Sequence, residues 1–428
     1  MIIHVVLQGE TISSIAQFYG KSTERLALEN GINPDENLVV GETLVILFPE
    51  IEYTVGMGDT IEGIARYYNT SVMALLRNNP YLSDRQYIYP GEVIVINYRG
   101  YKMGKISTNG LAYPFINLDI LKKTLPFLTY VTVYGYFYNV QGNIVDIDDT
   151  AIIKASKAYG VAPVMMLAAL SSIQEEEMEI THNMLINQDV QDILISNLIS
   201  ILTTKGYYGV NFKTPFIRYE DRLLFNDFIE KLSEQLHSAG FKVFITLTVG
   251  AFDLLSNVQY GEINFESLGR QADRIIFLTY ERGFLFGISA NVVAFDTFNN
   301  NIEYIVSKIS KEKIEMGLST IGYIWRLPYI VNKTSGQAIS YESAIALARE
   351  NNVEIKYDEV AKSSYYQYFA QYEYIVRFRD ARGVDSIVGL VPTHGISGMA
   401  IWNIMFFYNQ MWLVINSQYE IEKLTLQP

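Results

Sequence analysis

The side chains with which this chain could do chemistry are carboxylates, amides, lysines and aromatic rings. Its 428 residues include no cysteine and four histidines, which excludes a thiolate nucleophile and leaves little scope for a histidine-rich metal site. We expect neither a metal nor a cofactor. Tyrosine is abundant, with 32 Tyr beside 22 Phe and 3 Trp. Such rings suit stacking on sugars or wet interfaces, although most of them should fill a core.

Charge and hydropathy narrow the possible partners. The chain carries 33 Lys and Arg against 46 Asp and Glu, a net charge of −13, which argues against nucleic acid or an anionic membrane as the main partner. No segment approaches the ~20 apolar residues that span a bilayer. The first residues lack the basic and apolar regions of an export signal. We therefore expect a protein made in the cytoplasm without a signal peptide.

The first hundred residues contain a repeat. Gly9–Ile12 (Gly-Glu-Thr-Ile) recurs as Gly58–Ile61 (Gly-Asp-Thr-Ile), at an offset of 58 − 9 = 49, and Asn30 and Asn79 keep this offset. The threonine of each copy stands where a helix N-cap hydroxyl is wanted. Each copy predicts the order strand, helix, helix, strand. The predicted strands are His4–Leu7, Thr43–Leu47, Tyr53–Val55 and Val93–Asn97.

This repeat resembles the lysin motif (LysM), a small βααβ module, with the copies at 1–48 and 51–98. The resemblance implies binding of N-acetylglucosamine polymers such as peptidoglycan or chitin, in a groove between the loop after the first strand and the loop before the last. The implied groove residues are Gly9, Glu10, Thr11, Ile12, Asn30, Gly31 and Ile32 in the first copy, and Gly58, Asp59, Thr60, Ile61, Asn79, Pro80 and Tyr81 in the second. The alternative is that the threonines and acidic residues only cap helices and the isoleucines are core.

Beyond Lys105, buried-strand patterns alternate with amphipathic helical ones. Eight strands with intervening helices over 105–428 predict an α/β fold, a (β/α)8 TIM barrel. A small α+β insertion is expected at about 332–380, where polar residues and tyrosines are more frequent. The predicted strands are Leu111–Phe115, Tyr130–Tyr136, Ala162–Leu170, Gly209–Phe212, Lys242–Leu247, Arg274–Thr279, Ile314–Ser319 and Gly398–Trp402.

Several strings in this region carry a second resemblance. They include Lys205–Asn211 (Lys-Gly-Tyr-Tyr-Gly-Val-Asn), Leu278–Glu281 (Leu-Thr-Tyr-Glu) and Ile401–Asn403 (Ile-Trp-Asn). With the two modules in front, the chain resembles the spore-cortex-lytic N-acetylglucosaminidases of endospore-forming bacteria, which belong to glycoside hydrolase family 18. The resemblance implies a sugar cleft at the barrel mouth. Its remaining residues would be Tyr280, Glu281, Tyr323, Trp325 and Trp402.

The catalytic motif of that family is not kept. The family carries Asp-x-x-Asp-x-Asp-x-Glu at the fourth strand, where Glu protonates the glycosidic oxygen and the preceding Asp orients the acetamido group of the substrate. Here the four positions are Tyr208, Asn211, Lys213 and Pro215, of which Asn211 follows the pattern of the spore branch, where Asn often stands at this place. Proline has no proton to donate, and lysine places a positive charge where a cation must form. We expect no hydrolysis, and we expect Lys213 to fill the old sugar pocket beside Tyr208, Tyr280 and Glu281.

Three functions remain open at this point. The first is a non-catalytic spore-envelope protein, a pseudo-glycosidase anchored by its LysM modules and acting as a structural or binding component. The second is an active cortex N-acetylglucosaminidase with a displaced acid. The third is a self-assembling spore surface layer or filament. The expected partner is an N-acetylglucosamine polysaccharide, peptidoglycan or chitin. Other coat proteins or further copies of the chain are open partners, and the cortex–coat interface, the coat and the exosporium are the candidate locations.

Overall fold

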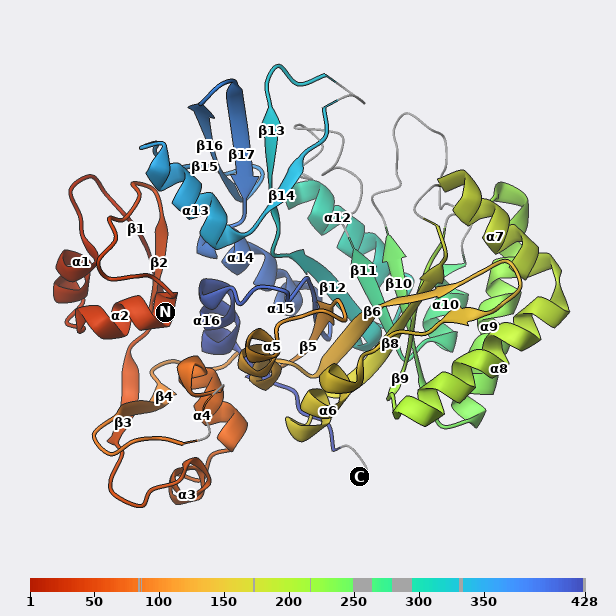
Figure 1. Ribbon diagram of the computed structural model, residues 1–428, viewed down its shortest axis with the longest axis horizontal. Helices are drawn as coiled ribbons and strands as arrows, with labels where there is room; N and C mark the ends of the chain where they lie inside the picture. Colours follow the sequence, from red (N-terminus) through yellow and green to blue (C-terminus); the bar gives the residue numbers. More distant parts are fainter. Residues whose placement is uncertain are drawn as a thin grey trace.

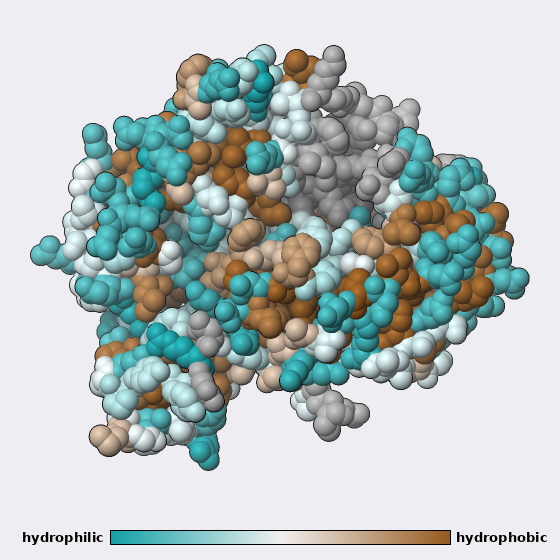
Figure 2. Space-filling view, viewed as in Figure 1, coloured by the Kyte–Doolittle hydropathy of each residue, from teal (hydrophilic) through white to brown (hydrophobic). Residues whose placement is uncertain are grey.

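A computed structural model describes residues 1–83, 85, 87–171, 174–215, 217–248, 264–278, 295–330 and 334–425. Two small modules, red and orange in Figure 1, lie beside a larger α/β domain. Apolar side chains gather in the middle of the same face, over the larger domain (Figure 2). Within the described residues no helix is long and apolar enough to cross a membrane.

Each module has the predicted βααβ order. In the first module β1 pairs antiparallel with β2, and in the second β3 pairs with β4. The cap prediction is confirmed, because Thr11 accepts a hydrogen bond from the Ser14 amide and Thr60 accepts one from the Gly63 amide. The first strand begins earlier than we predicted. The elements are β1 (Ile2–Val5), α1 (Ile12–Phe18), α2 (Thr23–Asn30), β2 (Thr43–Ile46), β3 (Pro49–Thr54), α3 (Ile61–Tyr67), α4 (Val72–Asn78), η1 (Pro80–Leu82) and β4 (Val93–Tyr98).

The larger domain is the predicted parallel barrel, closed by pairing of β5 with β6. The prediction of a first strand at Leu111–Phe115 is wrong, because β5 covers Lys105–Ala112. Ser107, Thr108 and Asn109 of this strand are buried although they are polar, so the strand contains no long apolar run by which it could be predicted. The barrel strands are β5, β6 (Tyr130–Tyr138), β8 (Ala162–Ala169), β9 (Gly209–Lys213), β10 (Lys242–Thr248), β11 (Arg274–Leu278), β12 (Ile314–Ser319) and β18 (Gly398–Trp402).

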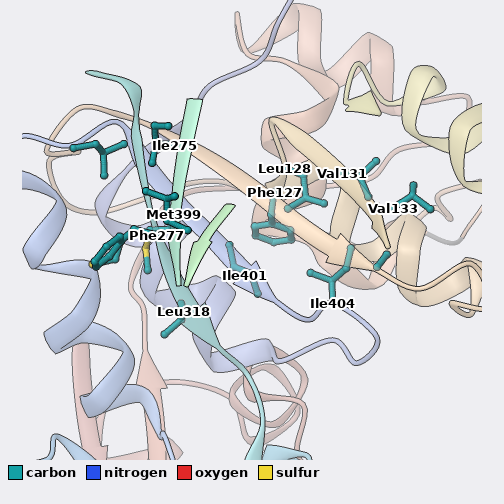
Figure 3. Packing of buried hydrophobic residues seen from close by; sticks show 14 of the residues in the cluster. Phe127, Leu128, Val131, Val133, Ile275, Phe277, Leu318, Met399, Ile401 and Ile404 are labelled. Carbon is teal, nitrogen blue, oxygen red and sulfur yellow. The ribbon is translucent and has the colours of Figure 1, made fainter. Parts of the chain in front are cut away.

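Helices cover the outside of the barrel, and strand residues alternate between its interior and this outer layer. Val131 and Val133 of β6, and Ile275 and Phe277 of β11, pack in the outer layer (Figure 3). Short β7 (Ile144–Val145) and β19 (Glu420–Ile421) extend the sheet. The helical elements are α5 (Leu118–Thr124), η2 (Leu125–Phe127), α6 (Thr150–Ala158), α7 (Gln174–Ile186), α8 (Gln188–Lys205), η3 (Tyr219–Asp221), α9 (Arg222–Ser238), α10 (Phe265–Gln271), α12 (Phe295–Val306), η4 (Lys311–Lys313), α14 (Ala381–Val388), α15 (Leu390–His394) and α16 (Asn409–Gln418).

A second, antiparallel sheet is inserted between the last two barrel strands. Its strand order is β14-β13-β17-β16-β15, and α13 (Tyr341–Glu350) accompanies it. The sheet includes β13 (Gly322–Arg326), which precedes the point near residue 332 where we expected the insertion to begin. The other strands are β14 (Gln337–Ile339), β15 (Lys356–Asp358), β16 (Ser363–Phe369) and β17 (Glu373–Phe378).

Hydrogen bonds dock both modules onto the larger domain. In the first module, Thr43 Oγ1 donates to Gln410 Oε1 at 2.9 Å, and the Val40 carbonyl accepts from the Ile355 amide at 2.9 Å. In the second, Arg77 donates to the Pro126 carbonyl at 3.1 Å. These contacts are made by buried or half-buried groups, so the modules have a defined orientation relative to the barrel.

Candidate functional site

Strand β9 brings Lys213, one of the positions that we aligned with the family motif, to the carboxyl end of the barrel, where active sites of this fold lie. Phe212 points outward, its ring 5.7 Å from that of Phe228 in α9. Asn211 and Lys213 therefore face the interior, as the two-residue period of a strand requires. Thr246 of β10 donates to Asn211 Oδ1 at 2.8 Å. Pro215 follows the strand and is buried.

The remaining motif position lies elsewhere. Tyr208 precedes β9, at the amino end of the barrel, and its ring centroid is 6.0 Å from that of Tyr130. The strand thus separates Tyr208 from Lys213, which is half-buried at the other end. Tyr280 and Glu281, which we expected beside Lys213, lie outside the described residues.

Two acidic residues follow β9 in η3, yet one of them is engaged elsewhere. Asp221 is buried, and both of its carboxylate oxygens lie 2.9 Å from His182 Nδ1. This pair ties η3 to α7 and occupies the carboxylate. Glu220 is exposed. Within the described part of the chain, no group of three or more His, Cys, Asp or Glu is placed to hold a metal ion.

Aromatic rings surround Trp402, which is half-buried at the end of β18. Its ring meets Tyr134 at 5.7 Å and Tyr113 at 6.0 Å, both edge to face. Tyr113 also stacks with Phe115 at 5.4 Å. The rings at 113 and 134 were not among the predicted site residues, although the inward face of β6 could have indicated Tyr134. The arrangement offers apolar faces on which a sugar ring can stack.

Two further predicted cleft aromatics, Tyr323 and Trp325, belong to β13 of the inserted sheet. Tyr323 is half-buried, and Trp325 is only 1% exposed. Their rings stack at 5.7 Å with an interplanar angle of 29°. Trp325 therefore supports Tyr323 from the core, and Tyr323 is the ring of this pair that is accessible to a ligand.

A buried carboxylate lies inside the barrel, near the amino end of β12. Glu315 is 0% exposed and accepts hydrogen bonds from Ser107 at 2.7 Å and Asn109 at 3.3 Å. Burial raises the pKa of Glu315, opposed by these hydrogen bonds and by the nearby Arg274 guanidinium. Because we searched the β5 region for an apolar run, we did not predict the polar residues that bind the Glu315 carboxylate. Because it is sealed from solvent at the end away from the mouth, it is not a candidate acid for a polysaccharide.

The module asparagines that we expected in the sugar grooves are structural in their contacts. Asn30 exchanges hydrogen bonds of 2.7 and 3.0 Å with the backbone of Val45. Asn79 does the same with Val95 at 2.8 and 2.7 Å. Both side chains are buried and join the second helix of a module to its last strand. Their amide groups are thus used within the fold.

The acidic residues of the groove loops are also engaged within the modules. Glu10 Oε2 accepts from the Leu7 amide at 2.7 Å and lies 2.9 Å from His4 Nε2. Its pKa is lowered, first by the hydrogen bond from the Leu7 backbone. In the second module, Asp59 Oδ2 accepts from the Gly56 amide and from the Tyr53 hydroxyl, both at 2.7 Å. The Tyr53 hydrogen bond lowers the pKa of Asp59 most.

The groups left open in the grooves are backbone atoms and apolar side chains. Gly9 and Gly58 have φ of +86° and +85°, with no atom within 4 Å of where a Cβ would stand. Ile12 is buried core, whereas Ile32 and Ile61 are half-buried. Gly31 lies against Asn409 of α16, so the first module meets the barrel domain at this loop. In the second module, Pro80 and Tyr81 remain half-buried.

Comparison with known proteins agrees with this architecture. The family model for glycosyl hydrolases family 18 matches residues 181–406, more than half of the chain. The LysM domain model matches residues 4–47 and 53–97. The chain belongs to glycosyl hydrolase family 18 and carries two LysM domains ahead of its barrel.

Full-length relatives have the same organisation. The cortical fragment-lytic enzyme of Bacillus subtilis is 26% identical over 435 residues, covering 100% of both chains. The enzyme of the same name from Bacillus anthracis is 26% identical over 431 residues, with 98% of this chain and 99% of that one covered. The crystal structure of the spore cortex-lytic enzyme SleL of Bacillus megaterium matches with a TM-score of 0.81 and 26% identity, over 99% of each chain.

Proposed function

We propose that this chain is a spore-associated protein that holds cortex peptidoglycan through its LysM domains and has a barrel without glycosidase chemistry. The spore location and the peptidoglycan partner are supported by the names and full-length similarity of the relatives. The loss of chemistry rests on one observation. Lys213 and Pro215 stand at the mouth end of β9, where the family mechanism needs two carboxylates.

The electrostatics at this end of β9 oppose hydrolysis. Bond cleavage by this family builds positive charge at the anomeric carbon, which a neighbouring carboxylate stabilises and an ammonium group destabilises. Pro215 has no ionisable group, and Asp221 is held by His182. A sugar can still stack on the Trp402 and Tyr134 rings, because stacking needs no proton donor.

A direct assay tests this proposal. The full chain is incubated with purified cortex peptidoglycan, pelleted with it, and the supernatant is analysed for new reducing ends. We expect the protein in the pellet and no new reducing ends. A typical turnover of about 1 to 10³ per second would contradict the non-catalytic part. Protein that stays in the supernatant would contradict the binding part.

The second candidate is an active cortex N-acetylglucosaminidase whose acid comes from another position. The observation that favours it is the naming of full-length relatives as lytic enzymes, which supports this alternative more than a non-catalytic role. Glu281, which follows the sixth barrel strand in sequence, is the residue to test. If the chain releases reducing sugar and Glu281→Gln abolishes that release, this candidate replaces the first.

A further inference from the structure

We infer that each LysM domain binds the glycan strand with a second element outside its groove, the exposed ring of Phe18 in the first domain and of Tyr67 in the second. This inference rests on the proposed function, because it concerns how the same polysaccharide is held. The two rings occupy the same place in the repeat, at an offset of 67 − 18 = 49. They are the last residues of α1 and α3.

Both rings are largely in solvent. Phe18 is 78% exposed and Tyr67 is 80% exposed. A single exposed apolar residue is ordinary on a protein surface. Here the exposure occurs twice, at the same position of both copies of the repeat. An aromatic ring kept in water at both places indicates a ligand that meets both copies in the same way.

Each exposed ring is held by a second ring. Phe18 meets Tyr19 edge to face at 4.9 Å and 90°. Tyr67 meets Tyr68 in the same geometry, at 5.0 Å and 83°. The supporting tyrosines are half-buried against the module cores, so the exposed rings are presented on a fixed base.

The supporting rings are in turn connected to the groove loops. In the first domain, Tyr19 hydroxyl lies 3.2 Å from His4 Nδ1, and His4 Nε2 contacts the Glu10 carboxylate that holds the loop. In the second domain, the Tyr68 ring lies 5.8 Å from that of Tyr53, whose hydroxyl donates to Asp59. The exposed ring and the groove loop of each domain are thus continuous through side-chain contacts.

A glycan strand fits this arrangement better than a protein surface. A polysaccharide repeats the same sugar face along its length, so it can present one face to each of two duplicated rings. Sugar rings have apolar faces that stack on flat aromatic groups. The position holds Phe in one domain and Tyr in the other, which preserves a flat ring and changes only the hydroxyl group.

The test measures binding isotherms of the full chain on purified cortex peptidoglycan. Phe18→Ala and Tyr67→Ala should each weaken binding about 2- to 12-fold, and the double variant should lose more than either. Phe18→Tyr should retain affinity, whereas Phe18→Leu, which is apolar but not flat, should lose it. Phe369→Ala is the matched control, because this ring is 76% exposed on the inserted sheet, in another part of the chain.

The possible outcomes distinguish failure of this inference from failure of the proposed peptidoglycan binding on which it rests. Equal binding by the wild type and the double variant overturns the role of the rings and leaves LysM binding intact. No binding by the wild type overturns both. If the double variant binds normally but sediments as a smaller species, the rings join copies of the chain and the inference is wrong. Thermal unfolding of each variant should be unchanged, since the rings are exposed.

Discussion

Thr246 Oγ1 donates a 2.8 Å hydrogen bond to Asn211 Oδ1 inside the barrel. Both side chains are 0% exposed and come from adjacent strands, β9 and β10. The bond orients the amide of Asn211, which lies two residues before Lys213 on the same face of β9. A neutral polar pair therefore joins β9 to β10 inside the barrel.

This pair gives the first prediction. Thr246→Val keeps the shape of the side chain and removes the donor, which leaves the buried Asn211 oxygen without this partner. We expect a loss of about 1–3 kcal/mol in the free energy of unfolding, measured by urea denaturation. Thr203→Val, at an exposed position of α8, is the control and should change stability little. An equal effect of both substitutions would mean that the Asn211 contact is not what stabilises the barrel here.

Restoring the carboxylates tests the chemistry of the barrel mouth. Pro215→Glu alone should release no reducing sugar from cortex peptidoglycan, because the Lys213 charge remains. The double variant Lys213→Asp, Pro215→Glu supplies both groups and should give detectable turnover, since general acid catalysis is worth about 10²–10⁴-fold. Lys213→Asn, Pro215→Gln is matched in size and should stay inactive. Turnover by Pro215→Glu alone would show that the ammonium group does not oppose the reaction.

The buried amide of the second LysM domain predicts a large stability effect. Asn79→Ala removes four hydrogen bonds, with Leu75, Tyr81 and the Val95 backbone, and leaves the Val95 groups without this partner in the core. We expect a loss of about 2–4 kcal/mol, measured by thermal unfolding. Asn97→Ala on β4 removes one exposed hydrogen bond, to Glu50, and is the control. If the two variants unfold at the same temperature, the amide is not a structural tie.

The carboxylates of the groove loops predict that the stability of the protein falls in acid. The pKa values of Glu10 and Asp59 are lowered in the folded protein. Their stabilising contribution is therefore fully present above the ordinary carboxyl pKa and is lost as the pH falls through the lowered values. Glu10→Gln and Asp59→Asn should flatten the fall in melting temperature between about pH 5 and pH 2. Curves parallel to that of the wild type would exclude these two groups.

Much of the fold follows from the spacing of residues in the sequence. The offset of 49 predicted two βααβ modules, and the two-residue period predicted that Asn211 and Lys213 share the inner face of β9. The first barrel strand could not be found this way. Ser107 and Asn109 are polar yet buried, because they bind Glu315 on a strand far away in sequence. No local pattern records such a partner.

In the candidate site, too, only the roles that depend on neighbouring residues in the sequence could be predicted. The threonine caps of α1 and α3 were predicted, because a cap depends on the residues next to it. The roles of Asn30 and Asn79 depend on a strand about 15 residues further on, with which their amides pair. Trp325 is a similar case, since its burial comes from a sheet that forms by pairing of β13 with β17.

The docked first domain has a mechanical consequence. Arg349 of α13 donates to the Asn37 carbonyl at 2.7 Å and forms an ion pair with Glu36, in the loop that precedes β2. With the Thr43–Gln410 bond, this contact prevents the domain from swinging about the chain that joins it to the rest of the protein. If this domain binds a glycan strand, as we propose, the direction of that strand relative to the barrel axis is therefore fixed. The first LysM domain and the barrel thus have a fixed relative orientation, unlike domains joined by a flexible linker.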